Sequence, residues 1–265
     1  MSALLLLFLS AQSIAGTLIL IPENTKARQI ATELTKGIPD SEISTTLTKD
    51  AEYDLIITVG NQAFLSLGQN LKTPHIAAFV SYNLINSVEP TPYQRIAVYN
   101  NPSPIDLQAS LRKYFGEAEI GYIYSDPQEP YLNFLKSSGV NIADIALENG
   151  DVFKSLRSLY SHSKLKAFYI SENRNVFDRK NILYVLESLY RNRIASISSN
   201  IALQSRGTLL SIVVEESDII QKTISIAKNW KPNATIEPHN FVKPRIIFDD
   251  KLAQSIDIVL EDSND

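Results

Sequence analysis

Hydrophobic residues along this chain occur as short β-branched runs separated by amphipathic segments. The clearest run is Leu55–Val59, which is typical of a strand buried on both faces of a parallel sheet. Gly60 ends this run, and a helical pattern begins at Asn61. Pro74 interrupts that pattern, and His75–Val80 is a second buried strand. The pattern therefore predicts a strand–helix–strand unit, around which the rest of the chain is arranged.

The same alternation continues on both sides of this unit. We expect further strands at Thr17–Ile21, Glu42–Thr45, Arg95–Val98, Ile120–Tyr124, Val140–Ala146, Ala167–Ile170, Ile194–Ser196, Thr208–Val213 and Arg245–Phe248. We expect helices at Ala27–Leu34, Pro104–Tyr114, Tyr131–Lys136, Asp151–Tyr160, Asn181–Tyr190 and Glu216–Trp230, and one that begins near Asp249. Strands that alternate with helices imply mostly parallel sheets with right-handed crossovers.

The clearest internal boundary is Asn100–Pro104, where two prolines in three residues prevent regular structure. Ser103 is a good N-cap for the helix that follows. We therefore predict two α/β lobes, with lobe 1 at residues 16–116 and lobe 2 at 117–213. Residues 214–265 are expected to return to lobe 1 and to form the C-terminal segment. Two such lobes facing a cleft are the architecture of hinge-closing binding proteins.

The N-terminus has the pattern of an export signal. Ala3–Leu9 is a short apolar segment, and Ser13 and Ala15 are small residues suited to cleavage after Ala15. Residues 1–15 are therefore interpreted as a signal peptide and the mature protein as periplasmic. No Lys or Arg precedes the apolar segment, and a buried N-terminal strand is the alternative interpretation.

Composition narrows the possible chemistry. The 265 residues include 44% hydrophobic residues, enough for a large core, and the net charge of −4 disfavours a nucleic-acid partner. The chain has no cysteine, which excludes disulfides, thiolate metal sites and a cysteine nucleophile. Known nucleotide-binding and hydrolase motifs are missing. His75, His162 and His239 lie far apart in the sequence. We therefore expect neither an enzyme nor a metal or cofactor site.

The candidate ligand-binding residues follow the strands, because ligands of open parallel sheets bind beyond the carboxyl ends of the strands. They are Asn61, Gln62, Ser81, Tyr82, Ser125, Asp126, Glu172, Asn173, Ser198 and Ser199. These mostly short, polar side chains suit hydrogen bonding to a small solute, and helix N-termini would offer N–H groups to an anionic part. Asp126 or Glu172 would face an ammonium group. The alternative for Asn61 is a helix cap and for Asp126 a turn residue.

Several long stretches resemble one protein family in their order and spacing. They are DLIITVGNQAFLSL, TPHIAAFVSY, PIDLQASLRKYFGEAEIGYIYSD, KLKAFYISENRNV, IASISSNIALQSRGTLLSIVVEESDIIQKTISIA and PRIIFDDKLAQSIDI. Together they are similar to the ABC-transporter substrate-binding proteins of the uncharacterised type that includes tryptophan- and tyrosine-binding members. Glu172-Asn173 stands where an Asp-Asn pair commonly lines the cleft of that family, and Gly116 replaces its usual proline. Such departures are typical of a divergent branch.

The resemblance implies an exported protein with the type I periplasmic-binding-protein fold, which carries a small solute to a membrane permease. The function expected from the sequence is therefore a periplasmic solute-binding protein of an ABC-type uptake system, with a small polar or amino-acid-like ligand in the interlobe cleft. The alternative is an accessory or sensor protein that uses the same fold to engage a membrane receptor.

Overall fold

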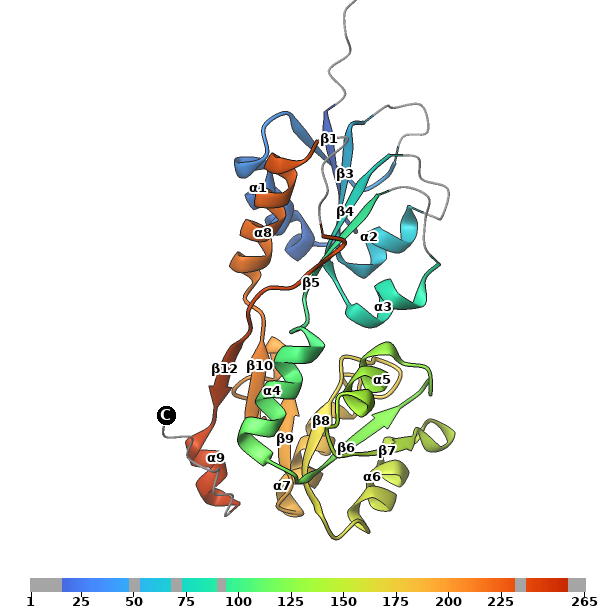
Figure 1. Ribbon diagram of the computed structural model, residues 1–265, viewed down its shortest axis with the longest axis vertical. Helices are drawn as coiled ribbons and strands as arrows, with labels where there is room; N and C mark the ends of the chain where they lie inside the picture. Colours follow the sequence, from blue (N-terminus) through green and yellow to red (C-terminus); the bar gives the residue numbers. More distant parts are fainter. Residues whose placement is uncertain (1–15, 48–52, 68–72, 90–93, 232–236, 257–265) are drawn as a thin grey trace, which may run out of the picture.

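The computed structural model describes residues 16–47, 53–67, 73–89, 94–231 and 237–256. The predicted signal peptide, residues 1–15, lies outside the described residues. Figure 1 shows two lobes stacked along the long axis of the molecule, each a twisted sheet with helices on both faces. Across the described ranges, no helix is long and apolar enough to span a membrane.

The sheet of lobe 1 has the strand order β11-β5-β4-β3-β1-β2, and all of its pairs are parallel. Its strands are β1 Thr17–Leu20, β2 Ser41–Ser44, β3 Leu55–Val59, β4 His75–Val80, β5 Arg95–Tyr99 and β11 His239–Asn240. The helices that pack on it are α1 Thr25–Gly37, α2 Gly60–Ser66, α3 Tyr82–Ser87 and α8 Glu216–Asn229. The central strand β3 is buried at all five positions, as its β-branched run predicts.

The sheet of lobe 2 has the strand order β12-β10-β9-β8-β6-β7. Its strands are β6 Glu119–Tyr124, β7 Ile142–Ala146, β8 Leu165–Ile170, β9 Ala195–Ser198, β10 Leu210–Val213 and β12 Arg245–Phe248. The last strand pairs antiparallel with β10, and the other pairs are parallel. The helices of this lobe are α4 Pro104–Phe115, α5 Pro130–Ser137, α6 Val152–Tyr160, α7 Ile182–Arg191 and α9 Asp250–Ser255. The α/β class with two mostly parallel sheets is confirmed.

The path of the chain between the lobes differs from the predicted bounds at two places. Helix α4 precedes residue 117, yet Leu107 and Leu111 are buried in the core of lobe 2. The crossing occurs at the prolines before α4, where Ser103 Oγ accepts a hydrogen bond from Asp106 N at 3.0 Å and caps the helix. The C-terminal region returns to lobe 1 only with α8 and β11. It then crosses again, because β12 pairs with β10 and Ala253 of α9 packs in the core of lobe 2.

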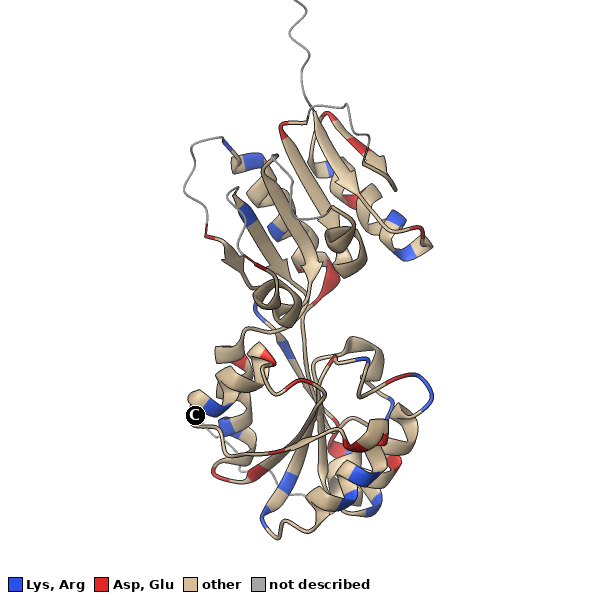
Figure 2. Cartoon of the chain, turned by 90° about the vertical axis from the view of Figure 1, so that its right-hand side faces the viewer, with Lys and Arg blue, Asp and Glu red and all other residues tan. Residues whose placement is uncertain are grey.

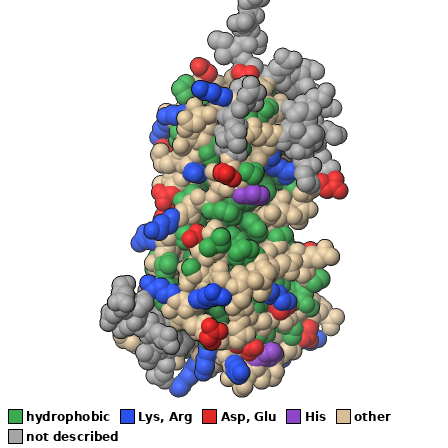
Figure 3. Space-filling model, in the orientation of Figure 1, with side chains coloured by type: hydrophobic (Ala, Val, Ile, Leu, Met, Phe, Trp, Pro, Cys, Tyr) green, Lys and Arg blue, Asp and Glu red, His purple; other side chains and the backbone are tan. Residues whose placement is uncertain are grey.

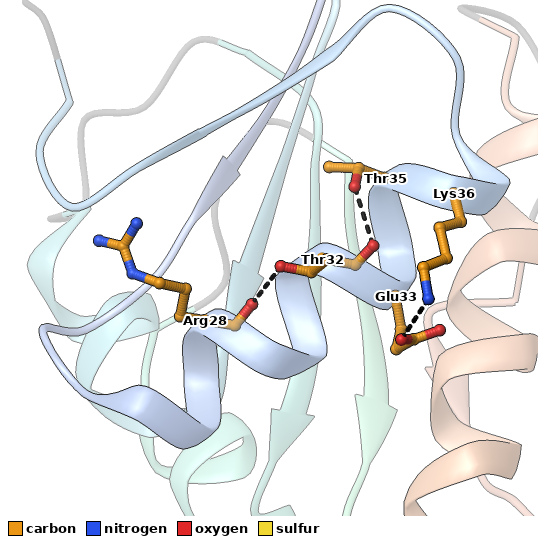
Figure 4. A network of polar contacts seen from close by, with 5 residues as sticks. All are labelled: Arg28, Thr32, Glu33, Thr35 and Lys36. Atoms are coloured by element: carbon orange, nitrogen blue, oxygen red, sulfur yellow. Dashed lines mark hydrogen bonds and ion pairs between the residues drawn. The ribbon is translucent and has the colours of Figure 1, made fainter.

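Helix α1 illustrates how the amphipathic pattern forms these layers. Its apolar face packs on the sheet of lobe 1, and Asn24 caps its N-terminus by accepting a hydrogen bond from Ala27 N at 2.8 Å. On the polar face, Thr32 Oγ1 donates to Arg28 O at 2.9 Å, and Lys36 Nζ lies 2.6 Å from Glu33 Oε1 (Figure 4). The side chains at three- and four-residue spacing therefore divide the helix into a buried and a solvated face.

Acidic and basic residues alternate along the chain in both lobes in the cartoon of Figure 2. Figure 3 shows hydrophobic side chains that reach the surface in the middle of one face, where the two lobes meet. Ile105 at the start of α4, 65% exposed, is among the large hydrophobic side chains that solvent contacts.

Candidate functional site

A pocket of about 290 Å³ lies between the lobes. Lobe 1 contributes α3 and the segment after β5, and lobe 2 contributes the segments after β6 and β8. These are carboxyl ends of parallel strands, where ligands of open α/β sheets bind. The lining residues are Ser81, Tyr82, Asn83, Leu84, Ser87, Asn101, Tyr122, Ser125, Asp126, Glu129, Pro130, Tyr131, Tyr169, Ser171, Glu172, Asn173 and Asn175.

Ser81 and Tyr82 reach the pocket because β4 ends in a bulge. The pairing of β4 with β5 shifts between Ala78 and Val80, and Phe79 between them has a positive φ of 58°. Such a conformation is strained for a residue other than glycine, and bulges of this kind redirect the end of a strand. Beyond the bulge, Ser81 caps α3 by accepting a hydrogen bond from Leu84 N at 3.3 Å.

Two asparagines hold this turn in place. Asn61 Oδ1 accepts a hydrogen bond from Ser81 N at 3.0 Å, and its Nδ2 donates to Ser81 Oγ at 3.3 Å. Asn101, which is buried, accepts a hydrogen bond from Tyr82 N at 3.1 Å. The wall that lobe 1 contributes is therefore fixed by side chains that follow β3 and β5 as well as β4.

Glu129 is the most deeply buried charged side chain of the pocket, with 4% of its surface exposed. Its Oε1 accepts hydrogen bonds from Tyr122 OH at 2.8 Å and from Asn83 Nδ2, whereas its Oε2 has no partner among the described residues. Burial raises the pKa of this carboxyl group, and the donors Tyr122, Asn83 and Asn173 act in the opposite direction.

Asn83 connects the two lobes directly. Besides donating to Glu129 from its Nδ2, it accepts a hydrogen bond at its Oδ1 from Tyr131 N at 2.9 Å. One short side chain on α3 therefore uses both its donor and its acceptor on α5 of the other lobe.

A series of tyrosine rings forms the apolar part of the wall. Tyr82 of lobe 1 meets Tyr131 of lobe 2 edge-on at 5.7 Å between ring centroids, and Tyr131 stacks on Tyr169 at 6.3 Å. Tyr169 also stacks on Tyr122 at 5.8 Å, and its hydroxyl lies 2.8 Å from Ser199 Oγ. Burial raises the pKa of the buried tyrosines well above the usual range, so they remain neutral hydrogen-bonding groups.

Glu172 and Asn173 follow β8 and line the opposite side of the pocket. Burial raises the pKa of the Glu172 carboxyl group to about 7, while a hydrogen bond with Asn101 and the charge of Arg174 lower it. Asn173 Nδ2 donates to Ser125 Oγ at 2.9 Å, which ties the loops after β6 and β8 together. The site thus contains a carboxyl group that ionises near neutral pH.

The structure brings together at the pocket six of the ten residues predicted from sequence, namely Ser81, Tyr82, Ser125, Asp126, Glu172 and Asn173. Two others support it from behind, because Asn61 holds Ser81 and Ser199 pairs with Tyr169. Gln62 is exposed on α2 and does not line the pocket. Ser198 is buried and donates to Ile170 O at 3.4 Å between β9 and β8. Asp126 is both a lining residue and a turn residue, since it accepts a hydrogen bond from Gln128 N at 2.9 Å.

Several residues that line the pocket were not predicted from the sequence. Asn83, Asn101, Glu129 and Tyr131 lie two to seven residues beyond the strand ends on which the prediction concentrated. A usable signal was present at Asn101, which lies two residues after the end of β5 and precedes Pro102. Glu129 had the same kind of signal, because it precedes the proline that begins α5.

The structure thus has two α/β lobes with a pocket between them. No protein family model matches the sequence, and no curated protein matches it. Solved structures do match over nearly the whole chain, and the resemblance predicted from sequence is confirmed at the level of fold. The chain has the type I periplasmic-binding-protein fold, which it shares with solved ABC-transporter solute-binding proteins at low sequence identity.

Three structures illustrate this similarity. A ligand-free, open substrate-binding protein with adhesive properties from Clostridium difficile is 14% identical, with a TM-score of 0.64 over 94% of this chain and 96% of the other. A conserved domain protein from Vibrio cholerae is 12% identical, with a TM-score of 0.61 over 94% and 97%. An ABC domain in complex with L-Trp from Streptococcus pneumonia is 16% identical, with a TM-score of 0.58 over 93% and 96%.

Proposed function

We propose that this protein is an exported solute-binding protein, which takes a small polar or amino-acid-like ligand into the interlobe pocket and presents it to the membrane permease of an ABC-type uptake system. One observation carries the proposal. A pocket of about 290 Å³ is lined from both lobes by polar side chains at the carboxyl ends of the strands. Its volume is at the lower limit of small-molecule sites, which suits a ligand of few atoms.

A ligand in this pocket would act by contacting both lobes at once. Asn101 and Tyr82 approach it from lobe 1, and Glu172 and Tyr131 from lobe 2. A solute that makes both sets of contacts has a higher affinity for the closed arrangement than for an open one, and it shifts the population toward closure. The closed surface, formed by both lobes, is then the form that a permease recognises. We expect no catalytic activity.

A thermal-shift screen tests the proposal. Purified protein is heated with amino acids, sugars and small organic ions, each at saturating concentration. A ligand at 100 times its Kd should raise the free energy of unfolding by about 2.7 kcal/mol. Ser125→Lys, which places a long charged side chain at the pocket wall, should abolish the shift. Gln128→Lys adds the same charge to the same loop outside the pocket and should preserve it.

The result that contradicts the proposal is a melting temperature that no solute changes. If such a protein copurified with a membrane receptor and supported no uptake, the accessory or sensor role would explain the fold instead. Uptake of a solute that requires this chain, together with a shift by the same solute, would support transport.

A further inference from the structure

Over the residues that the structure describes, the ionisable side chains of the pocket include carboxyl groups and no basic group. Asp126, Glu129 and Glu172 all line it, whereas no Lys, Arg or His is among its lining residues in the described part of the chain. Arg174 influences Glu172 from outside this lining. A ligand that enters without positive charge would leave three carboxyl groups without a counter-charge in a partly desolvated site.

Glu129 supplies an independent observation. Only 4% of this residue is exposed, and its Oε2 accepts no hydrogen bond within the described residues. A buried carboxylate oxygen without a donor is costly, and proteins normally satisfy such atoms. The pocket therefore has a buried carboxyl group directly behind its wall, whose charge favours a cationic ligand.

The arrangement suits an organic cation and not a metal ion. Within the described residues, no group of three or more His, Asp or Glu side chains is placed to hold a metal. The three carboxyl groups come from two separate loops, after β6 and β8, so they surround a volume and do not converge on a point. The rings of Tyr82 and Tyr131 add apolar and π surface, which attracts ammonium groups and their carbon neighbours.

Several N–H groups that could hold an anionic group are already used. Pro130 at the start of α5 has no N–H, and Tyr131 N donates to Asn83. At the start of α3, Tyr82 N donates to Asn101 and Leu84 N donates to Ser81. These two helix N-termini therefore offer an anionic part fewer N–H groups than the first turn of a helix normally leaves without a partner.

We propose that the ligand of this pocket is a small organic amine, which carries an ammonium group and no carboxylate. This inference rests on the proposed solute-binding function and narrows its substrate class. The ammonium group would donate to Glu172 and lie near the buried carboxyl group of Glu129, and the carbon skeleton would lie against the tyrosine rings. An α-carboxylate on the same skeleton would face Asp126 or another carboxyl group without a cation to pair with.

Matched ligand pairs test this inference by isothermal titration calorimetry at pH 8. Tyramine is compared with tyrosine and phenethylamine with phenylalanine, since each pair differs only by the carboxylate. Putrescine and N-acetyltyramine complete the set. We expect at least one free amine to bind, and to bind at least tenfold more tightly than its amino acid, about 1.4 kcal/mol. N-acetyltyramine, which lacks the charge, should not bind.

Substitutions in the pocket test which carboxyl groups bind the ammonium group. Glu172→Gln and Asp126→Asn should each weaken amine binding at least tenfold, whereas Glu148→Gln, in lobe 2 but outside the pocket, should leave the affinity unchanged. Circular dichroism and melting curves verify that each variant is folded. Asp126→Asn keeps an oxygen for the hydrogen bond from Gln128 N, so it preserves the turn if Glu172→Gln proves unstable.

The possible outcomes separate the two proposals. An amino acid that binds as tightly as its amine, or a sugar that binds where every amine fails, overturns the inference and leaves the solute-binding function intact. Amine binding that Glu172→Gln and Asp126→Asn do not alter also overturns it, because the charge would then be recognised elsewhere. A protein that binds no solute of any class contradicts both proposals.

Discussion

Glu172 couples the stability of the protein to pH. Burial raises the pKa of its carboxyl group from 4.5 to about 7, against the hydrogen bond with Asn101 and the charge of Arg174. Between these two pKa values the folded protein binds more protons than the unfolded chain, so the free energy of unfolding decreases as the pH rises from about 4.5 to about 7. The raised pKa of Glu129, which faces Asp126, contributes a slope of the same sign.

We therefore expect Glu172→Gln to flatten this pH dependence, because glutamine does not titrate. Urea unfolding between pH 4.5 and pH 7.5 measures the effect, and the variant should gain stability relative to the natural protein toward the upper end of that range. Glu23→Gln, on the exposed loop before α1, is the control and should reproduce the original slope. A variant whose slope equals that of the natural protein would show that Glu172 does not titrate in this window.

The raised pKa of Glu172 also predicts how the affinity of the protein for an amine depends on pH. An ammonium ligand pairs with ionised Glu172 and Glu129, and the pKa values of both carboxyl groups are raised in the free protein. Binding must then release protons below about pH 7, so the Kd for an amine that binds should fall as the pH rises from 5 to 8. Calorimetry in buffers of different ionisation enthalpy measures the released protons directly. A Kd that is constant over this range would contradict the pairing.

At the scale of elements, the contact of α1 with α8 attaches the late helix to lobe 1. A Cβ added at Gly37 would lie 2.5 Å from Ile224 Cδ1 and 2.8 Å from its Cγ2. The branched side chain of Ile224 has few other rotamers on a helix, so the helices themselves must separate. Gly37→Ala should lower the free energy of unfolding by about 1–3 kcal/mol.

A double-mutant cycle tests this close approach. Ile224→Ala alone should cost about 2–5 kcal/mol because it leaves a cavity, but it removes all three atoms that the new Cβ would meet. The cost of Gly37→Ala should therefore largely vanish in that background. Ser225→Ala, on the exposed side of α8, should change stability by less than about 0.5 kcal/mol. Additive effects of the two core substitutions would refute the contact.

Most helices and strands of this fold can be predicted from the sequence, because a long segment with one hydrophobic period favours one type of secondary structure. Strand β3 has the predicted bounds Leu55–Val59, and helix α8 ends one residue before the predicted Trp230. The pattern missed α3, which has six residues, and β11, which has two, because such lengths carry too few residues to show a period. Helix α2 ends at Ser66, well before the proline that was expected to stop it. Strand β12 was found, but its antiparallel pairing with β10 depends on contacts that local pattern does not encode.

The sequence indicates where the strands near the site end, but it does not indicate which strand ends lie close together in the folded protein. The loops after β4, β6 and β8 line the pocket, whereas Ser198 is the last residue of β9 and bonds the neighbouring strand β8. Glu129 was missed because its importance comes from burial and from Tyr122 and Asn83, which are distant from each other in sequence. Such convergence is a property of the tertiary structure, and only the coordinates reveal it.

At the scale of the molecule, three covalent segments join the lobes, at the prolines before α4, between β10 and α8, and between β11 and β12. Figure 1 shows these segments running side by side between the two sheets. Across the pocket, the lobes also touch through side chains. The rings of Tyr82 and Tyr131 meet edge-on, and the amide of Asn83 bonds Glu129 and Tyr131 N. If the lobes open and close about the covalent segments, these side-chain contacts must break and re-form.

Asn83→Asp should therefore bias the molecule toward an open arrangement. The new carboxylate would replace the donor to Glu129 with a like charge, and two like charges about 4 Å apart repel by about 4 kcal/mol at an effective dielectric constant of 20. Small-angle X-ray scattering at pH 8 should show a larger radius of gyration than in the natural protein, and an intermediate value for Asn83→Ala. At pH 5 the two carboxyl groups would share a proton, and the difference should shrink. Asn133→Asp, which adds the same charge on the exposed side of α5, should leave the scattering unchanged. A radius of gyration that Asn83→Asp does not alter would mean that the contacts of Asn83 do not set the distance between the lobes.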